Sequence, residues 1–255
     1  MSTDNITVSS YDKNANKWAD RLKKGKNLSH DFIEKPAMYN MIGNIEGKNI
    51  LCIGCGSGEE CEYLKNKGAN VTGIDISPGM ISVAKSEFPE IDFKVMDIEN
   101  LNFENHLFDC VFASLVMHYL DDWTKSLNEI YRILKKGGTF IISTHHPVTH
   151  NSEILRDNDN SSYLLGYSKR FKDRSIRQYG DYYSIDKKEK IWPGNFKISF
   201  YNKPVSLMIN KIISAGFTIE SVSEPKPVVD ALKINPEFYN IYTKLPLFFL
   251  IKARK

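Results

Sequence analysis

Short apolar runs alternate with helical segments through the middle of the chain. The run at 50–53 is continuously apolar, which is typical of a strand buried on both faces of a parallel sheet. Four later runs also have the character of strands: 70–74, 91–96, 108–114 and 139–144. The segments between them include three helix-compatible patterns: 59–67, 78–86 and 122–134. This alternation predicts a parallel, doubly wound α/β sheet with right-handed crossovers.

The two ends of the chain extend this core. We predict one sheet domain built from residues 1–147 and 204–255, in which residues 1–45 form a loosely attached N-terminal helical arm. Residues 148–203 break the rhythm with many tyrosines and charges, and are predicted to be an insertion after the fifth strand, with short antiparallel strands. The pattern then returns with a helix at 205–215 and strands at 217–224 and 247–253. A helix at 122–134 is expected to end in the loop 135–138, at its Gly-Gly pair.

Composition adds few constraints. The chain has 255 residues, of which 42% are hydrophobic and 25% are charged, enough for one sizeable α/β domain with an insertion. Its net charge of +3, from 34 basic and 31 acidic residues, falls short of the basic excess of a dedicated nucleic-acid binder. The polar N-terminus lacks a signal-like apolar segment, and no apolar run approaches the roughly 20 residues that span a bilayer. We therefore expect a cytoplasmic protein without a membrane segment.

Two of the four cysteines have the spacing of a redox or zinc motif. Cys52 and Cys55 are separated by two residues, while Cys61 and Cys110 fall on the next helix and on another strand. No second pair completes a tetrahedral site. We interpret the cysteines as small residues packed around a tight turn and predict no metal.

A glycine-rich turn directly follows the first strand. Gly54, Gly56 and Gly58 stand at alternate positions, where a side chain would require an unfavourable positive φ or block a ligand from the backbone. A dinucleotide fingerprint would place its third glycine at position 59, which is Glu59. A carboxylate at a helix start disfavours a pyrophosphate. The turn therefore favours a ligand with a positive charge and no phosphate.

The stretch from Ile50 to Gly58, ILCIGCGSG, resembles the first motif of the class I S-adenosylmethionine (SAM) dependent methyltransferases, a Rossmann-like family. The resemblance covers residues 30–145 well and 205–255 loosely. It implies SAM as the cofactor and a mostly parallel, seven-stranded sheet with an antiparallel terminal strand. In this family the N-terminal helices fold over the cofactor, so Tyr11 and the segment 34–36 are expected to border the site, with helix packing and a proline at a helix start as the alternative.

The cofactor site is expected at the carboxyl ends of the strands, where ligands bind in such sheets. Asp75 ends the second strand, nineteen residues after Gly56, and its two oxygens could accept both ribose hydroxyls. Its alternative role as a helix cap is weakened by Ser77, which can cap the next helix itself. The resemblance places Asp97 against the adenine amino group, with a loop-capping role as the alternative. The full predicted set is Ile53, Gly54, Cys55, Gly56, Gly58, Asp75, Ile76, Met80, Asp97, Ile98, Ser114 and Tyr11.

Methyl transfer requires alignment more than acid–base chemistry. The reaction is an in-line displacement with a neutral leaving group, so a base is needed only for a protonated or weakly nucleophilic acceptor. Three histidines at or after strand ends are candidates: His118, His145 and His146. His146 is preferred because Pro147 restricts its backbone, and a structural role is the alternative for each.

Three functions compete. The first is methylation of an O or N atom of a small-molecule acceptor, with residues 148–203 covering its pocket; a homodimer surface is the alternative role of that insertion. The second is RNA or protein methylation, because five basic residues between 169 and 177 surround Phe171, although they could equally form the solvated face of a β-ribbon. The third is a nicotinamide oxidoreductase or a non-catalytic nucleotide-binding module, which Glu59 disfavours.

Overall fold

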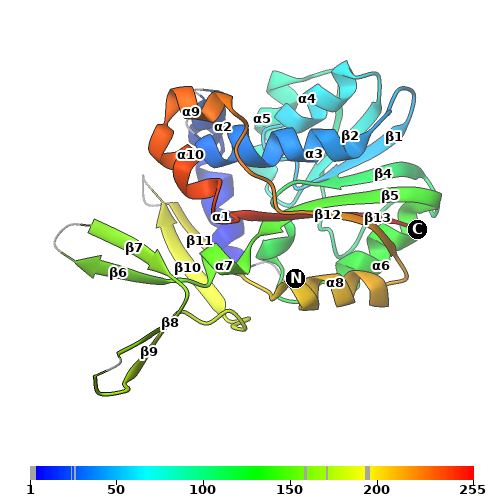
Figure 1. Cartoon of the computed structure of the whole chain (residues 1–255). Coiled ribbons are helices and arrows are strands. Elements are labelled where there is room, and N and C mark those ends of the chain that lie inside the picture. The colour runs from blue at the N-terminus through cyan, green and yellow to red at the C-terminus, as the bar shows by residue number, and fades with distance from the viewer. Residues whose placement is uncertain (1–3, 24, 26, 158–159, 171, 193–195) are drawn as a thin grey trace.

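A seven-stranded sheet forms the centre of the computed structural model, which describes all residues except 1–3, 24, 26, 158–159, 171 and 193–195 (Figure 1). The strands lie in the order β12-β13-β5-β4-β1-β2-β3. β13 runs antiparallel to both of its neighbours, whereas the other pairs are parallel. The predicted mostly parallel sheet is therefore confirmed. The strands are β1 (Asn49–Ile53), β2 (Asn70–Asp75), β3 (Asp92–Val95), β4 (Phe108–Ala113), β5 (Leu134–His145), β12 (Thr218–Ser223) and β13 (Phe248–Arg254).

Helices cover both faces of the sheet. The side chains of β1 alternate, so that Leu51 and Ile53 join one buried cluster while Ile50 and Cys52 join the other. The first cluster also holds the apolar faces of α6 (Thr124–Ile133) and α8 (Val205–Ser214). The second holds those of α3 (Lys35–Ile42), α4 (Glu59–Asn66) and α5 (Pro78–Glu87).

The segment 135–138 differs from its prediction as a loop. β5 begins at Leu134, directly after α6, and therefore includes these residues. The end of β13 holds the segment in the sheet, since Arg254 pairs with Thr139 and the backbone N–H of Lys255 donates to the Gly138 carbonyl. Pairing with a strand over a hundred residues later has overridden the local stop signal.

In the described chain, three helices precede α3: α1 (Asn5–Lys13), α2 (Ala15–Lys23) and the π-helix η1 (His30–Glu34). Ala15 and Ala19 of α2 are buried against Met80 and Val83 of α5. α1 also contacts α5. The arm is therefore packed on the domain, rather than loosely attached as its polar composition suggested.

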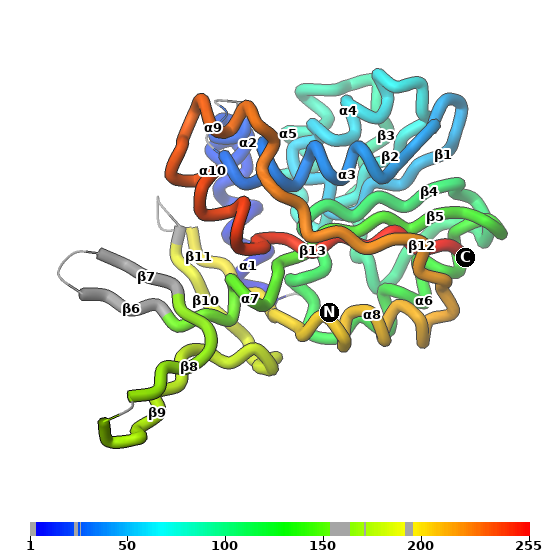
Figure 2. The backbone as a smooth tube through the Cα atoms, in the orientation of Figure 1, coloured from blue at the N-terminus to red at the C-terminus, as the bar shows by residue number. Residues whose placement is uncertain are grey.

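The insertion begins with α7 (Pro147–His150) and continues as three separate two-stranded hairpins. β11 (Phe196–Tyr201), which pairs with β10 (Lys187–Trp192), lies next to α1. The other hairpins are β6 (Glu153–Asp157) with β7 (Asn160–Leu164) and β8 (Gly166–Lys169) with β9 (Ile176–Tyr179). The β8–β9 hairpin projects away from the sheet (Figure 2). Two short helices that the sequence pattern did not predict, α9 (Asp230–Ile234) and α10 (Pro236–Tyr242), connect β12 to β13.

Candidate active site

The glycine turn lies between β1 and α4. Gly54, Gly56 and Gly58 all have positive φ angles, which favour glycine. A Cβ at Gly58 would lie 2.9 Å from the rings of Phe88 and Phe93, so that glycine is required for packing. No atom would lie within 4 Å of a Cβ at Gly56. The space beside Gly56 belongs to a cavity between the glycine turn and the neighbouring strand ends, where a ligand can approach the backbone.

Asp75 lies directly beside this turn. Its Oδ2 accepts a hydrogen bond from the Gly56 backbone N–H at 3.0 Å, and its Oδ1 accepts one from the Ser77 N–H at 2.9 Å. Ser77 itself caps α5, because its hydroxyl accepts the Met80 N–H at 3.1 Å, as predicted. Burial raises the pKa of Asp75 despite these backbone donors. Each oxygen retains a lone pair for a second donor.

The cavity runs along the carboxyl ends of β1, β2, β4 and β5. It gathers most of the site residues that the sequence predicted. Those that line it are Ile53, Gly54, Cys55, Gly56, Asp75, Ile76, Met80, Asp97, Ile98, Ser114, Tyr11, His118 and His145. Gly58 and His146 are not among its lining residues. Asp97 also caps its own loop, since its Oδ1 accepts the Glu99 N–H at 2.9 Å.

The ring of His146 turns away from the cavity. Its Nε2 lies 2.9 Å from Oε1 of Glu224, and its Nδ1 accepts the Val148 N–H at 3.2 Å. The ring packs edge-on against Phe249. The preference for His146 as the base therefore does not fit the geometry, although Pro147 does follow it at the start of α7.

A stack of three histidines borders the cavity instead. The rings of His118 and His145 lie 3.8 Å apart at 17°, and those of His145 and His150 lie 3.8 Å apart at 6°. Phe200 of β11 packs edge-on against all three. Within the described structure, Nδ1 of both His118 and His145 is buried without a hydrogen-bond partner. His150 was not predicted from the sequence, because only the fold of α7 brings it back over β5.

All three stacked histidines favour the neutral form. Burial, with the nearby charge of Lys203, lowers the pKa of His118 to about 3. Burial and the neighbouring imidazoles hold the pKa of His145 well below its usual range, and burial and the Lys190 charge do the same for His150. Near neutral pH each of these rings has one N–H that can donate and one nitrogen that can accept a hydrogen bond. None carries the second proton of an imidazolium, which a general acid would give up.

Aromatic rings from the N-terminal helices close the other side of the cavity. The hydroxyl groups of Tyr11 and Tyr119 are 2.6 Å apart. Trp18 packs edge-on against Tyr11 and stacks on Phe196 of β11. The sequence prediction included Tyr11 but not Trp18, although Trp18 stands seven residues later, at a helical spacing. The further N-terminal lining residues are Thr7, Val8, Leu22, Asn27 and His30.

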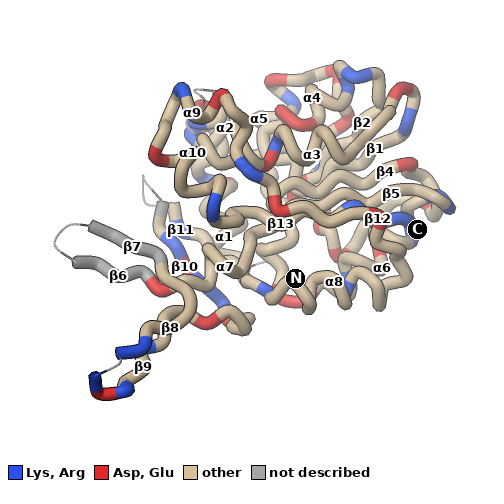
Figure 3. The backbone as a smooth tube through the Cα atoms, in the orientation of Figure 1, with Lys and Arg blue, Asp and Glu red and all other residues tan. Residues whose placement is uncertain are grey.

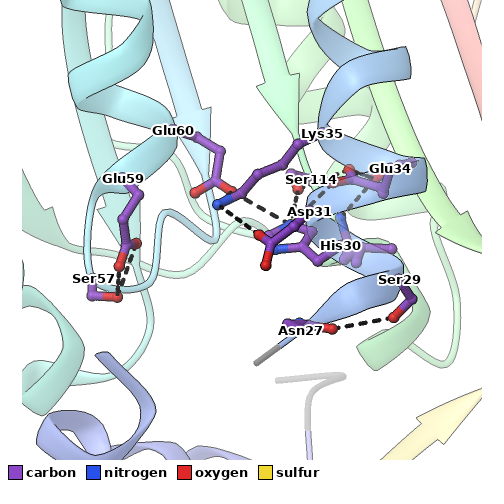
Figure 4. A network of polar contacts seen from close by, with 12 residues as sticks. Asn27, Ser29, His30, Asp31, Glu34, Lys35, Ser57, Glu59, Glu60 and Ser114 are labelled. Carbon is purple, nitrogen blue, oxygen red and sulfur yellow. Dashed lines mark hydrogen bonds and ion pairs between the residues drawn. The ribbon is translucent and has the colours of Figure 1, made fainter. Parts of the chain in front are cut away.

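A buried polar network lies at the glycine-turn end of the cavity (Figure 4). Glu34, which is fully buried, accepts hydrogen bonds from the hydroxyls of Ser114, at 2.9 Å, and of Ser143. His30 Nε2 lies 3.0 Å from Oε2 of Glu34 and 3.4 Å from Oε1 of Glu60. Lys35 Nζ lies 3.4 Å from the same Glu60 oxygen. The N-terminal arm thus contributes charges as well as rings to the site.

Comparison with known proteins identifies the family. A family model described as a methyltransferase domain matches residues 51–142. An S-adenosylmethionine dependent methyltransferase from Mesorhizobium loti has the same fold, with a TM-score of 0.71 and 25% identity over 87% of this chain and 97% of that one. The chain belongs to the class I SAM-dependent methyltransferases. Its cofactor is therefore SAM.

Two curated relatives extend this comparison. An uncharacterized protein from Haemophilus influenzae is 30% identical over 98% of both chains. A ubiquinone biosynthesis O-methyltransferase from Alkalilimnicola ehrlichii is 31% identical over a stretch that covers 62% of this methyltransferase and 66% of that relative. The similarity to the named relative thus covers only part of either protein.

The cavity of this methyltransferase fits SAM rather than a dinucleotide. Glu59 and Glu60 stand at the start of α4 and line the cavity, where they would repel a pyrophosphate and attract the positive charge of a sulfonium or an ammonium. Burial, with the neighbouring Glu60, raises the pKa of Glu59. The four cysteines are all buried and free. In the described residues, no group of three or more His, Cys, Asp or Glu side chains could hold a metal ion, and no helix is long and apolar enough to cross a membrane.

Proposed function

We propose that this methyltransferase transfers the methyl group of SAM to an O or N atom of a small-molecule acceptor. One observation carries the proposal. The cavity that starts at the glycine turn continues past Ser114 to His118, His145, Tyr11 and Tyr119. A cofactor site thus opens into a chamber of aromatic rings and neutral imidazoles, which suits a compact, partly apolar molecule with one polar group.

In this proposal, residues at the carboxyl ends of the strands contact each part of SAM. Asp75 accepts both ribose hydroxyls through its remaining lone pairs. Ile76, Met80 and Ile98 contact the adenine ring, and Asp97 accepts a hydrogen bond from its amino group. The backbone at Gly54, Cys55 and Gly56, next to Ile53, borders the methionine portion, and Ser114 lies near the sulfonium end.

The acceptor chamber needs only weak bases. When SAM is bound it supplies an electrophilic methyl group, and the leaving group, its demethylated product, is a neutral thioether. The neutral rings of His118 and His145 accept a hydrogen bond from the acceptor O–H or N–H and orient its lone pair along the line of displacement. A methylated amine keeps its proton as an ammonium, whereas methylation of a neutral hydroxyl oxygen gives an oxonium, whose proton is strongly acidic. Even an imidazole with a depressed pKa can then receive that proton.

The role of the insertion follows from its position. None of the described residues 148–203 lines the cavity, but Phe196 and Phe200 of β11 pack directly behind its lining. We propose that the β10–β11 hairpin fixes the shape of the acceptor chamber by supporting Tyr11 and the histidine stack. The O-methyltransferase relative supports oxygen as one of the two acceptor atoms.

Binding of the cofactor tests the central claim. Calorimetry should show binding of SAM and of its demethylated product, S-adenosylhomocysteine, and no binding of NAD. Asp75→Ala should weaken SAM binding by about 1 kcal/mol or more, because hydrogen bonds to charged groups contribute about 1.5 to 3 kcal/mol. Asp92→Ala, an exposed residue at the opposite end of the neighbouring strand, is the matched control. Tight NAD binding, or an Asp75 variant with unchanged SAM affinity, would contradict the proposed site.

RNA or protein methylation is a second candidate, for one reason. The tip of the β8–β9 hairpin carries five exposed basic residues and one acidic residue. No described residue of this hairpin lines the cavity, and for this reason the small-molecule acceptor is preferred.

A further inference from the structure

We infer that His30, on the N-terminal arm, binds the carboxylate of the methionine portion of SAM through its Nδ1–H, and that it does so only as the imidazolium. The inference rests on the proposed function, because it requires SAM in this cavity. It makes the charge of one arm residue a condition for tight cofactor binding.

The two ring nitrogens of His30 have unequal surroundings. Nε2 faces three oxygens: Glu34 Oε2 at 3.0 Å, and Glu60 Oε1 and Ser114 Oγ at 3.4 Å each. Nδ1 is buried and has no hydrogen-bond partner in the described part of the chain. The side chain is only 10% exposed and lines the cavity. A buried polar atom normally has a partner, so Nδ1 marks a position for a polar group of a ligand.

Charge balance indicates which form of His30 the network holds. Glu34 and Glu60 bring two negative charges to its ring, and Lys35 supplies one positive charge. Asp31, whose Oδ1 lies 4.0 Å from Lys35 Nζ, adds a third negative charge, so protonation of His30 reduces the excess negative charge of the group. Burial alone would lower the pKa of His30, but the two carboxylates outweigh it and raise that pKa above its usual value. Both ring nitrogens of the imidazolium carry a proton, so Nδ1 is then a donor that selects an anion.

SAM offers one anionic group to such a donor. Its other charged groups, the sulfonium and the ammonium, are cationic, and only the carboxylate can accept a charge-assisted hydrogen bond from Nδ1. Glu59 and Glu60 also line this part of the cavity and would repel a carboxylate that met no cation. Protonated His30 would supply that cation. Its contact with Ser114, at the end of β4, ties it to the methyl-transfer end of the site.

The local backbone brings these groups together. His30 starts the π-helix η1, in which the Lys35 N–H reaches the His30 carbonyl. Such π-turns are often found at functional sites. The groups that face His30 or its direct partners come from every neighbouring element: Asp31 and Glu34 of η1, Lys35 of α3, Glu60 of α4, Ser114 after β4 and Ser143 of β5.

Calorimetry with two ligands separates this role from a structural one. SAM carries the methionine carboxylate, whereas methylthioadenosine keeps the adenine, ribose and sulfur but lacks the amino acid. His30→Gln should weaken SAM binding roughly tenfold at about pH 6 and leave methylthioadenosine binding unchanged. The difference in SAM affinity between the wild type and the variant should disappear as pH rises through the pKa of His30, because the imidazole then loses its charge. The amino group of SAM titrates equally in both proteins, so their difference isolates His30.

Nuclear magnetic resonance of the wild-type imidazole gives a readout that does not depend on folding of a variant. Addition of SAM should raise the pH at which His30 titrates, and methylthioadenosine should not. An equal loss of SAM and methylthioadenosine affinity in His30→Gln, or a titration that SAM leaves unmoved, would overturn the inference. If the wild type binds no SAM, the proposed function fails; if Asp75→Ala weakens both ligands while His30→Gln weakens neither, only the role of His30 fails.

Discussion

Individual histidines in this cavity are driven to opposite charge states. His30 faces the carboxylates of Glu34 and Glu60, which raise its pKa. His118 and His145 are stacked ring on ring in a buried site, where burial lowers the pKa of each. The same residue type thus favours the charged form beside Glu34 and Glu60 and the neutral form in the histidine stack.

The histidine stack should make the protein sensitive to mild acid. Burial lowers the pKa of His118 in the folded protein to about 3, below the usual histidine value of about 6.5, so the unfolded chain takes up a proton first as pH falls. The free energy of unfolding should therefore fall from about pH 6.5 downward, by up to about 1.4 kcal/mol per pH unit for this residue. Urea unfolding at several pH values measures the slope.

Replacing His118 with a side chain that does not titrate tests whether the histidine stack causes this acid sensitivity. His118→Phe should flatten the acid slope, whereas His106→Gln, at an exposed position, should leave it unchanged. The contribution of His30 to the pH dependence of stability has the opposite sign. Because the pKa of His30 is raised in the folded protein, His30 stabilises the fold at pH values below its pKa in the unfolded chain. This stabilisation is lost as pH rises through its pKa in the folded protein. Identical slopes in the wild type and His118→Phe would show that the stack does not control acid stability.

At the scale of elements, α1 holds the domain and the insertion together across the cavity. Asp12 accepts hydrogen bonds from the Gly79 N–H, at 2.6 Å, and from the Ser77 hydroxyl, at 3.2 Å, at the start of α5. On its other side, the Thr7 hydroxyl exchanges hydrogen bonds with the backbone of Ser199 in β11. Since Thr7 and Tyr11 line the cavity, this attachment also shapes the site.

Removing one attachment should loosen the arm. Asp12→Ala should lower the free energy of unfolding by about 1 kcal/mol, the typical effect of losing a carboxylate from a helix N-terminus. Hydrogen exchange of residues 5–13 should accelerate more than that of the sheet. Asp20→Ala, an exposed acidic residue of α2, is the matched control. Unchanged protection of α1 in Asp12→Ala would show that Asp12 does not hold the arm.

The elements predicted best from the sequence are those with local signals. The glycine turn and Asp75 follow from their spacing along one βαβ unit. The N-terminal lining could not be found this way, because Thr7 meets Ser199 only after the whole sheet has formed between them. The choice between His145 and His146 depended on orientation: side chains at successive positions point to opposite sides, so one residue decides which ring faces the cavity.

At the scale of the whole molecule, one projecting hairpin, β8–β9, carries a local excess of positive charge. The chain has only three more basic than acidic residues, yet the β8–β9 hairpin alone has five basic residues and one acidic residue (Figure 3). All of its described residues from 166 to 178 are exposed. Because these charges lie on a projection outside the cavity lining, they can affect what approaches the protein without changing the cofactor site.

Neutralising the hairpin tests whether it serves the reaction. We expect a variant with glutamine at its five basic positions to elute from heparin at lower salt, since fewer counterions are released, while its SAM affinity stays that of the wild type. The positions are Lys169, Arg170, Lys172, Arg174 and Arg177. A control with the same change in net charge replaces five exposed lysines outside the hairpin: Lys17, Lys85, Lys226, Lys233 and Lys244. A small-molecule acceptor predicts no transfer of labelled methyl groups from SAM to cellular RNA by any of the three proteins. Labelling of RNA that only the hairpin variant loses would instead assign the acceptor to RNA, because a change in net charge alone would affect both variants equally.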